Sequence, residues 1–251
     1  MYAVLALGQL SLGQAAFMGI GAYTGALLSL NFGMPFALVL AIAAVVPAVA
    51  ALVIGGPALR LTGVHLAIAT IGFGEVLRVF YINSETLGGG LGLTGIPQRA
   101  DGWTIYGILG VALGLFTLAS RSKIGRAWEA IREDEDAAKV AGINVTAYKM
   151  VAVILSAALA GLAGALNAHC SSFIGPGEYG FDAAVTVLSF ALLGGVSMPL
   201  GPVVGAFLLG ALPEVLRPLH DFRLIFNGLI IVVVVIFLPR GLLGFRVRRM
   251  G

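Results

Sequence analysis

The chain of 251 residues is 59% hydrophobic and only 11% charged, with a net charge of +3. Soluble domains have about 25% charged residues, so this composition excludes a chain covered by water and predicts that lipid solvates most of it. The small net charge gives no indication of nucleic-acid binding, and the single cysteine, Cys170, excludes an internal disulfide.

An uncharged apolar run covers residues 2–30. It lacks the basic start of a signal peptide and is too long for one. As a single helix it would measure about 45 Å, against an apolar membrane core of ~30 Å. Composition slightly favours a tilted helix whose polar residues bond to neighbouring helices. The alternative is a discontinuous helix lining a translocation path, for which Gln9, Ser11 and Gln14 are the candidate residues.

Seven further apolar stretches follow in chain order. They cover residues 36–54, 64–82, 105–120, 150–169, 183–198, 203–216 and 223–238. Several are shorter than the ~20 residues that a spanning helix needs, and the Gly/Pro-rich interruption at residues 194–202 predicts broken or re-entrant helices there. We therefore expect an all-α, polytopic transmembrane bundle of about eight spans, which forms one domain over residues 1–251.

Residues 121–149 are the one long charged stretch, with six of the fifteen Lys/Arg and five of the twelve Asp/Glu residues. Placing this loop in the cytoplasm puts eleven basic residues on the inner side and four on the outer side, as the positive-inside rule requires. The same parsing puts both termini in the cytoplasm. A charged internal loop in a membrane protein is the natural surface to present to a soluble partner.

Three stretches together are similar to one family. They read GQLSLGQAAFMGIGAY at residues 8–23, PALRLTG at 57–63 with GEVLR at 74–78, and GRAWEAIREDEDAA at 125–138. They resemble the LivM-type permease subunit of branched-chain amino acid ABC importers, and the likeness runs from Gly8 to about Phe245. Family members usually carry one or two apolar helices before the first stretch, so this chain is expected to be either truncated or started at an internal methionine.

The resemblance implies half of a translocation path in the bacterial inner membrane. It also implies a LivH-like second permease, two ABC ATPase subunits and a periplasmic substrate-binding protein as partners. No cofactor is implied, and the permease itself would catalyse no covalent chemistry. Substrates related to branched-chain amino acids, such as small amides, remain open at this point.

The charged loop contains the spacing Asp-Ala-Ala, three residues, then Gly at residues 136–142. ABC permeases present a short helix with a Glu-Ala-Ala-x-x-x-Gly signature to the ATPase, and small alanines suit a helix that enters a groove. A glycine there lets the chain leave the helix in a left-handed turn. The resemblance implies docking through Glu129, Asp136, Ala137, Ala138 and Gly142. The plainer interpretation is a solvated amphipathic loop.

Other motifs argue against enzyme chemistry. The G-x-G-x-x-G match at residues 90–95 lies in a loop between two spans, so it lacks the strand and helix of a dinucleotide site. No Gly-Lys dipeptide exists, so there is no Walker A motif and ATP must be hydrolysed by a partner. Three scattered histidines predict no metal site.

Two alternatives belong to other classes. The chain could be an ion-gradient-driven secondary transporter or channel, or a membrane scaffold without transport. The central spans at residues 105–120 and 150–169 contain no acidic residue, and proton or ion coupling usually needs one. The GxxxG pairs Gly21/Gly25, Gly110/Gly114 and Gly201/Gly205 are predicted to pack helices, and Glu75 with Arg78 to form a local ion pair.

Overall fold

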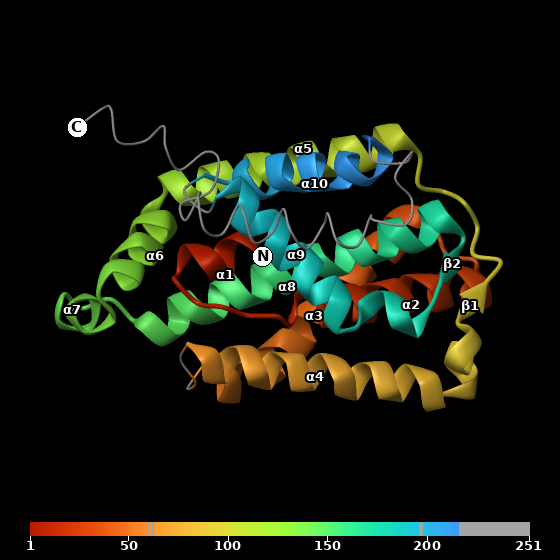
Figure 1. Ribbon diagram of the computed structural model, residues 1–251, viewed down its shortest axis with the longest axis horizontal. Helices are drawn as coiled ribbons and strands as arrows, with labels where there is room; N and C mark the ends of the chain where they lie inside the picture. The colour runs from red at the N-terminus through yellow and green to blue at the C-terminus, as the bar shows by residue number, and fades with distance from the viewer. Residues whose placement is uncertain (60, 62, 196–197, 216–251) are drawn as a thin grey trace. The chain divides into compact units, whose positions relative to one another are not determined.

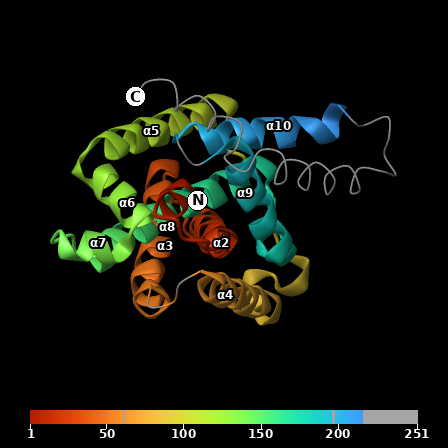
Figure 2. The same cartoon turned by 60° about the vertical axis from the view of Figure 1, so that its left-hand side comes forward.

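The computed structural model describes residues 1–59, 61, 63–195 and 198–215. The chain divides into two compact units, one formed by Ala3–Ala184 and the other by Met1–Tyr2 with residues from Val185 onward. Figures 1 and 2 show the elements of both units in two views.

The first unit is built almost entirely of helices. Its long helices are α2 (Gln14–Phe32), α3 (Phe36–Ala58), α4 (Val64–Asn83), α5 (Gly102–Arg121) and α8 (Val145–Ser171). Its short elements are α1 (Tyr2–Ala6, which starts in the other unit), α6 (Lys123–Glu133), α7 (Glu135–Val140), the 3-10 turns η1 (Glu85–Leu87), η2 (Gly89–Leu91) and η3 (Pro176–Tyr179), and the strands β1 (Leu93–Thr94) and β2 (Phe173–Ile174).

Five helices in the described part of the chain are long and apolar enough to cross a membrane. They correspond to the first five predicted stretches and confirm an all-α, polytopic membrane protein. The sixth and seventh stretches form the shorter helices α9 (Phe181–Gly194) and α10 (Gly201–Val215). The eighth, residues 223–238, lies outside the described residues.

Helices α2, α3 and α8 pack closely because glycines line their contacts. Gly21 lies against the carbonyl of Gly161, and Gly164 lies against the carbonyl of Met18, so a methyl group at either glycine would overlap backbone atoms. Gly25 faces Ala165 one turn along. The packing role predicted for the first GxxxG pair is therefore confirmed, since small residues let helices approach closely.

The two ends of this unit differ in character. Figure 1 shows α6 and α7 at one end and β1 and β2 at the other. The strands pair antiparallel, with Leu93 opposite Ile174. Nearby, Arg99 Nη1 donates to the carbonyl of Met34 at 2.8 Å, which fastens the loop before α5 to the α2–α3 turn. The Gly-rich loop that contains β1 and the charged segment therefore lie at opposite ends of this unit.

In the second unit, residues 185–194 of α9 pack against α10. Gly194 lies against the carbonyl of Gly201, and Gly205 against the carbonyl of Phe190. Helix α9, with 14 residues, measures about 21 Å, less than the ~30 Å apolar core of a membrane. The predicted break is present between α9 and α10, with Gly195 at φ +91°.

Candidate docking surface and cavity

The charged segment folds into successive short helices because a polar residue caps each start. Ser122 Oγ accepts from the Ile124 amide at 3.1 Å at the start of α6, and Asp134 Oδ1 accepts from two amides at 2.9 Å at the start of α7. Asn144 Oδ1 accepts from the Ala147 amide at 3.1 Å at the start of α8. Such caps satisfy amide groups that have no partner within the helix.

Helix α6 is amphipathic and lies with its apolar face on the bundle. Trp128 is buried, and its indole Nε1 donates to the carbonyl of Tyr148 at 3.2 Å. It belongs to a buried cluster, here called the Trp128 cluster, whose members are Ala3, Leu7, Trp128, Ile131, Ala138, Val145 and Ala152. The charged segment is thus part of the folded unit rather than a free loop.

Helix α7 is held by ion pairs. Glu135 Oε2 accepts from Lys149 Nζ at 2.7 Å, and Glu135 Oε1 lies 3.4 Å from Lys139 Nζ. The hydrogen bond from Lys149 is the main cause that lowers the pKa of Glu135. Lys139 also donates to Asp136 at 3.0 Å, and this contact raises the pKa of Lys139.

The outer face of α7 combines charge with apolar surface. Asp136 and Ala137 are exposed, and Val140 is 91% exposed at the end of the helix. Gly142, also exposed, has φ +82° and makes the predicted left-handed turn, with its amide donating to the carbonyl of Lys139 at 3.0 Å. Sequence reasoning did not include Val140, although its position one turn after Asp136 places it on the same face.

Ala138 departs from the prediction for the docking residues. Its side chain is only 3% exposed and packs within the Trp128 cluster. The side chain therefore fixes α7 to the bundle and is not available to enter a partner's groove. Glu129, on the outer side of α6, is exposed.

The first apolar run is not one tilted helix, so the interpretation that composition favoured is wrong. Helix α1 ends at Ala6 and α2 begins at Gln14, with Gly8 at φ +74° between them. Two side chains satisfy backbone groups that the break frees. Thr70 Oγ1 accepts from the Leu12 amide at 3.0 Å, and Ser11 Oγ accepts from the Gly13 amide at 3.4 Å.

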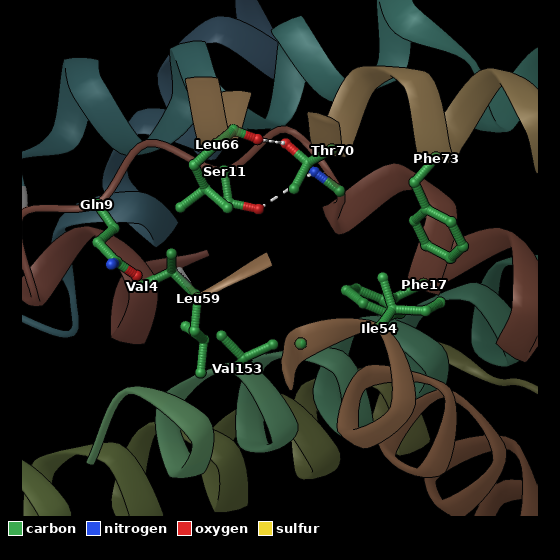
Figure 3. A pocket seen from close by; sticks show the side chains of 12 residues that line it. Val4, Gln9, Ser11, Phe17, Ile54, Leu59, Leu66, Thr70, Phe73 and Val153 are labelled. Atoms are coloured by element: carbon green, nitrogen blue, oxygen red, sulfur yellow. Dashed lines mark hydrogen bonds between the residues drawn. The ribbon is translucent and has the colours of Figure 1, made fainter. Parts of the chain in front are cut away.

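A cavity lies beside this break (Figure 3). Its lining residues are Val4, Gln9, Ser11, Gly13, Phe17, Ile54, Gly55, Leu59, Leu66, Thr70, Phe73 and Val153. In Figure 3, Ser11 and Thr70 lie on one wall, with Leu59 and Val153 opposite. The volume of about 30 Å³ is room for one or two water molecules, too little for an amino acid.

The three candidate path residues differ in their surroundings. Gln9 is 6% exposed, and neither polar atom of its side chain has a hydrogen-bond partner among the described residues. Leaving a buried amide without partners costs about 1–3 kcal/mol. Gln14 is also buried, but its Oε1 accepts from Ser156 Oγ at 3.0 Å across the α2–α8 contact. The structure thus brings Gln9 and Ser11 to the cavity and assigns Gln14 to helix packing.

The break also contacts the charged segment. Leu7 and Ala3 belong to the Trp128 cluster, and a Cβ atom on Gly8 would lie 3.3 Å from Cγ of Arg132 in α6. Residues next to Gln9 are therefore packed directly on α6. This continuity connects the exposed face of α7, through α6, to one wall of the cavity.

The charged pair Glu75 and Arg78 behaves as predicted. Arg78 Nη1 donates to Glu75 Oε2 at 3.0 Å within α4, and both side chains are partly exposed. In addition, Glu75 Oε1 accepts from the Phe181 amide at 3.2 Å, which ties α4 to the start of α9. Among the described residues, no group of three or more His, Cys, Asp or Glu side chains could hold a metal ion.

Five apolar helices of spanning length, with a folded charged segment at one end, define an integral membrane protein of the α-helical class. Residues 2–238 match the model of a family described as branched-chain amino acid transport system / permease component. The chain belongs to this family.

Individual relatives of the chain are also permease proteins of transport systems. The chain is 35% identical to the high-affinity branched-chain amino acid transport system permease protein LivM of Salmonella typhimurium, over 94% of this chain and 64% of that protein. It is 29% identical to LivH of Escherichia coli K12, over 57% of this chain and 46% of that protein. It is also 29% identical to the ribose import permease protein RbsC of the same strain, over 87% and 76%.

The chain therefore spans slightly less than two thirds of the length of its LivM relative. Comparison with solved structures finds no match.

Proposed function

We propose that this chain is a permease subunit of an ABC importer in a bacterial inner membrane and that it translocates branched-chain amino acids. The observation that carries the proposal is the family match over residues 2–238, which includes both the broken helix and the charged segment. The names of the LivM and LivH relatives support the substrate class and a pair of permease subunits.

In this proposal, the outer face of α6 and α7 docks one of two ABC ATPases in the cytoplasm. Exposed Glu129 and Asp136 offer charge, exposed Ala137 and Val140 offer apolar contact, and Gly142 ends the helix. A periplasmic binding protein delivers substrate at the opposite end, near β1 and β2. Both termini lie in the cytoplasm.

ATP hydrolysis belongs to the partners in this proposal, since the sequence has no Gly-Lys dipeptide and hence no Walker A motif. The permease contributes conformational change and forms no covalent intermediate. Movement of α7 and α6 on ATP binding would carry the Trp128 cluster with it. Because Leu7 belongs to that cluster, the movement would reach the break and widen the cavity, which is too small for substrate in this conformation.

Reconstitution into liposomes tests the proposal. Leucine uptake is expected only when the chain is combined with a LivH-like permease, ATPases and binding protein, and only with ATP inside the compartment that holds the ATPases. Uptake by the chain alone, driven by an ion gradient, would instead support a secondary transporter. The local pairing of Glu75 with Arg78 argues against that alternative, because it leaves this carboxylate without a free role in ion coupling.

A further inference from the structure

The Gln9 amide is the one feature of the cavity that the fold leaves incomplete. Its oxygen and nitrogen are both buried and lack partners among the described residues, whereas Thr70 and Ser11 in the same lining are engaged with backbone groups. Figure 3 places Gln9 at the edge of the cavity beside Val4. Buried polar groups without partners are rare, and each calls for a ligand, a water or a functional reason.

The hydrogen-bonding chemistry of a primary amide limits the classes of ligand that Gln9 could bind. Its NH₂ group donates two hydrogen bonds, and its oxygen accepts two. It can therefore meet both the carboxylate and the ammonium of a zwitterion while carrying no charge itself. Ser11 lies in the same lining, and its hydroxyl can supply a second polar contact.

The remaining lining sets the character of the ligand's side chain. Apolar side chains dominate the walls: Phe17, Ile54, Leu59, Leu66, Phe73 and Val153. No Asp, Glu, Lys or Arg is among the lining residues in the part of the chain that the structure describes. An aliphatic side chain would be favourable in such surroundings, and a charged one would lose its hydration without a partner.

We propose that Gln9 binds the main-chain ammonium and carboxylate of a neutral, aliphatic amino acid as it passes the helix break. This inference rests on the proposed transport function. It identifies one residue that would contact the substrate near the cytoplasmic end of the path. The cavity must widen to admit the ligand. The cavity adjoins the helix break, and the residues of the break pack on α6. A movement of α6 would therefore be transmitted to the cavity and could widen it.

The test uses the assembled transporter in lipid nanodiscs without the binding protein. Leucine is titrated, and the melting temperature of the permease is recorded, because a ligand that binds the folded state raises it. In Gln9→Met, which keeps the length of the side chain, the leucine concentration giving half of the rise should increase by about tenfold or more. The same variant should melt higher without leucine, because it removes an unpartnered buried amide.

Gln14→Met is the matched control, since Gln14 is a buried amide in the same segment whose partner is Ser156. It should lower the melting temperature and leave the leucine concentration for half effect unchanged. In Gln9→Glu, the carboxylate keeps acceptors and loses donors, so isoamylamine, which lacks the carboxylate of leucine, should become the better ligand. Gln9→Asn provides a second variant if Gln9→Met does not assemble.

An equal half-effect concentration in wild type and Gln9→Met would overturn the assignment and leave Gln9 as a site for water alone. Absence of any leucine effect in the wild type would overturn it as well. The proposed transport function is judged separately, by ATP-dependent leucine uptake of the wild-type complex. If the wild-type complex takes up leucine but Gln9→Met binds leucine as the wild type does, the Gln9 site is rejected and the proposed permease function stands.

Discussion

The ammonium of Lys149 lies 2.7 Å from a carboxylate oxygen of Glu135, and this ion pair joins α7 to the first turns of α8. The Lys149 side chain is only 4% exposed, whereas that of Glu135 is 37% exposed. The lysine has thus given up most of its hydration and depends on this carboxylate. The pair fixes where the exposed face of α7 points.

Removing the carboxylate of Glu135 should lower the stability of the protein more than removing the ammonium of Lys149. Glu135→Gln leaves a buried ammonium without a counter-charge, and we expect a loss of about 2 kcal/mol, reduced from the value for a fully buried pair because Glu135 is partly exposed. Lys149→Met should cost less. Thermal unfolding of the purified chain measures both, with Asp136→Asn, in an exposed pair, as the control. Equal losses in all three variants would contradict this account.

The same pair predicts a pH dependence. The pKa of Glu135 is lowered in the folded state by the hydrogen bond from Lys149. A lowered carboxyl pKa contributes stability above the unfolded value, ordinarily 4.5, and this contribution is lost as the pH falls through the folded value. The protection of the α7 amides against hydrogen exchange, corrected for the intrinsic exchange rate at each pH, should therefore fall below about pH 4.5 in the wild type. A wild-type response that Glu135→Gln fully retains would show that another group is responsible.

Glycines on α2 and α5 should respond in opposite directions. Gly21→Ala places a methyl group on the carbonyl of Gly161, and we expect a loss of about 3 kcal/mol as α2 and α8 separate. Gly110→Ala on α5 meets nothing within 4 Å in the described residues, and it should stabilise the helix by up to about 1 kcal/mol. Melting temperatures of the two variants test this. Similar changes in both would mean that α2 and α8 are not packed as described.

The left-handed Gly8 tests the connection between α6 and the break. Gly8→Ala forces a side chain into φ +74° and against Arg132, which should cost about 1–2 kcal/mol and lower leucine uptake. Gly33→Ala, at φ +56° with nothing within 4 Å, carries the same backbone penalty away from the break. Melting temperature and initial uptake rate are compared in both. Equal uptake in the two variants would remove the role assigned to the break.

Local sequence patterns predicted much of this fold. Hydropathy located the five long helices, and the charge distribution set apart residues 121–149, because both features depend only on neighbours in the chain. The break at Gly8 was predicted only as the less favoured alternative, because a tilted helix has the same composition. The hydrogen bond from the Leu12 amide to Thr70 and the closeness of Gly8 to Arg132 in α6 are tertiary contacts, which composition does not show.

The sequence predicted the short helix α7 but not which way its side chains face. The Ala-Ala spacing placed α7 correctly, yet the motif does not state which alanine faces the chain's own core. Ala138 faces inward because Trp128 of α6 and Val145 of α8, which belong to two other helices, meet it there. The Glu135–Lys149 pair was likewise not predictable, since it depends on how α7 and α8 are placed by the turn between them.

Co-purification is the most direct test of the proposed docking of an ATPase on the exposed face of α7. Val140→Arg puts a charge on the apolar contact, and Leu91→Arg puts the same charge on a side chain that is 87% exposed at the opposite end. The tagged permease should lose its ATPases in Val140→Arg and keep them in Leu91→Arg, with both variants correctly folded. Full retention of the ATPases by Val140→Arg would contradict docking through this face.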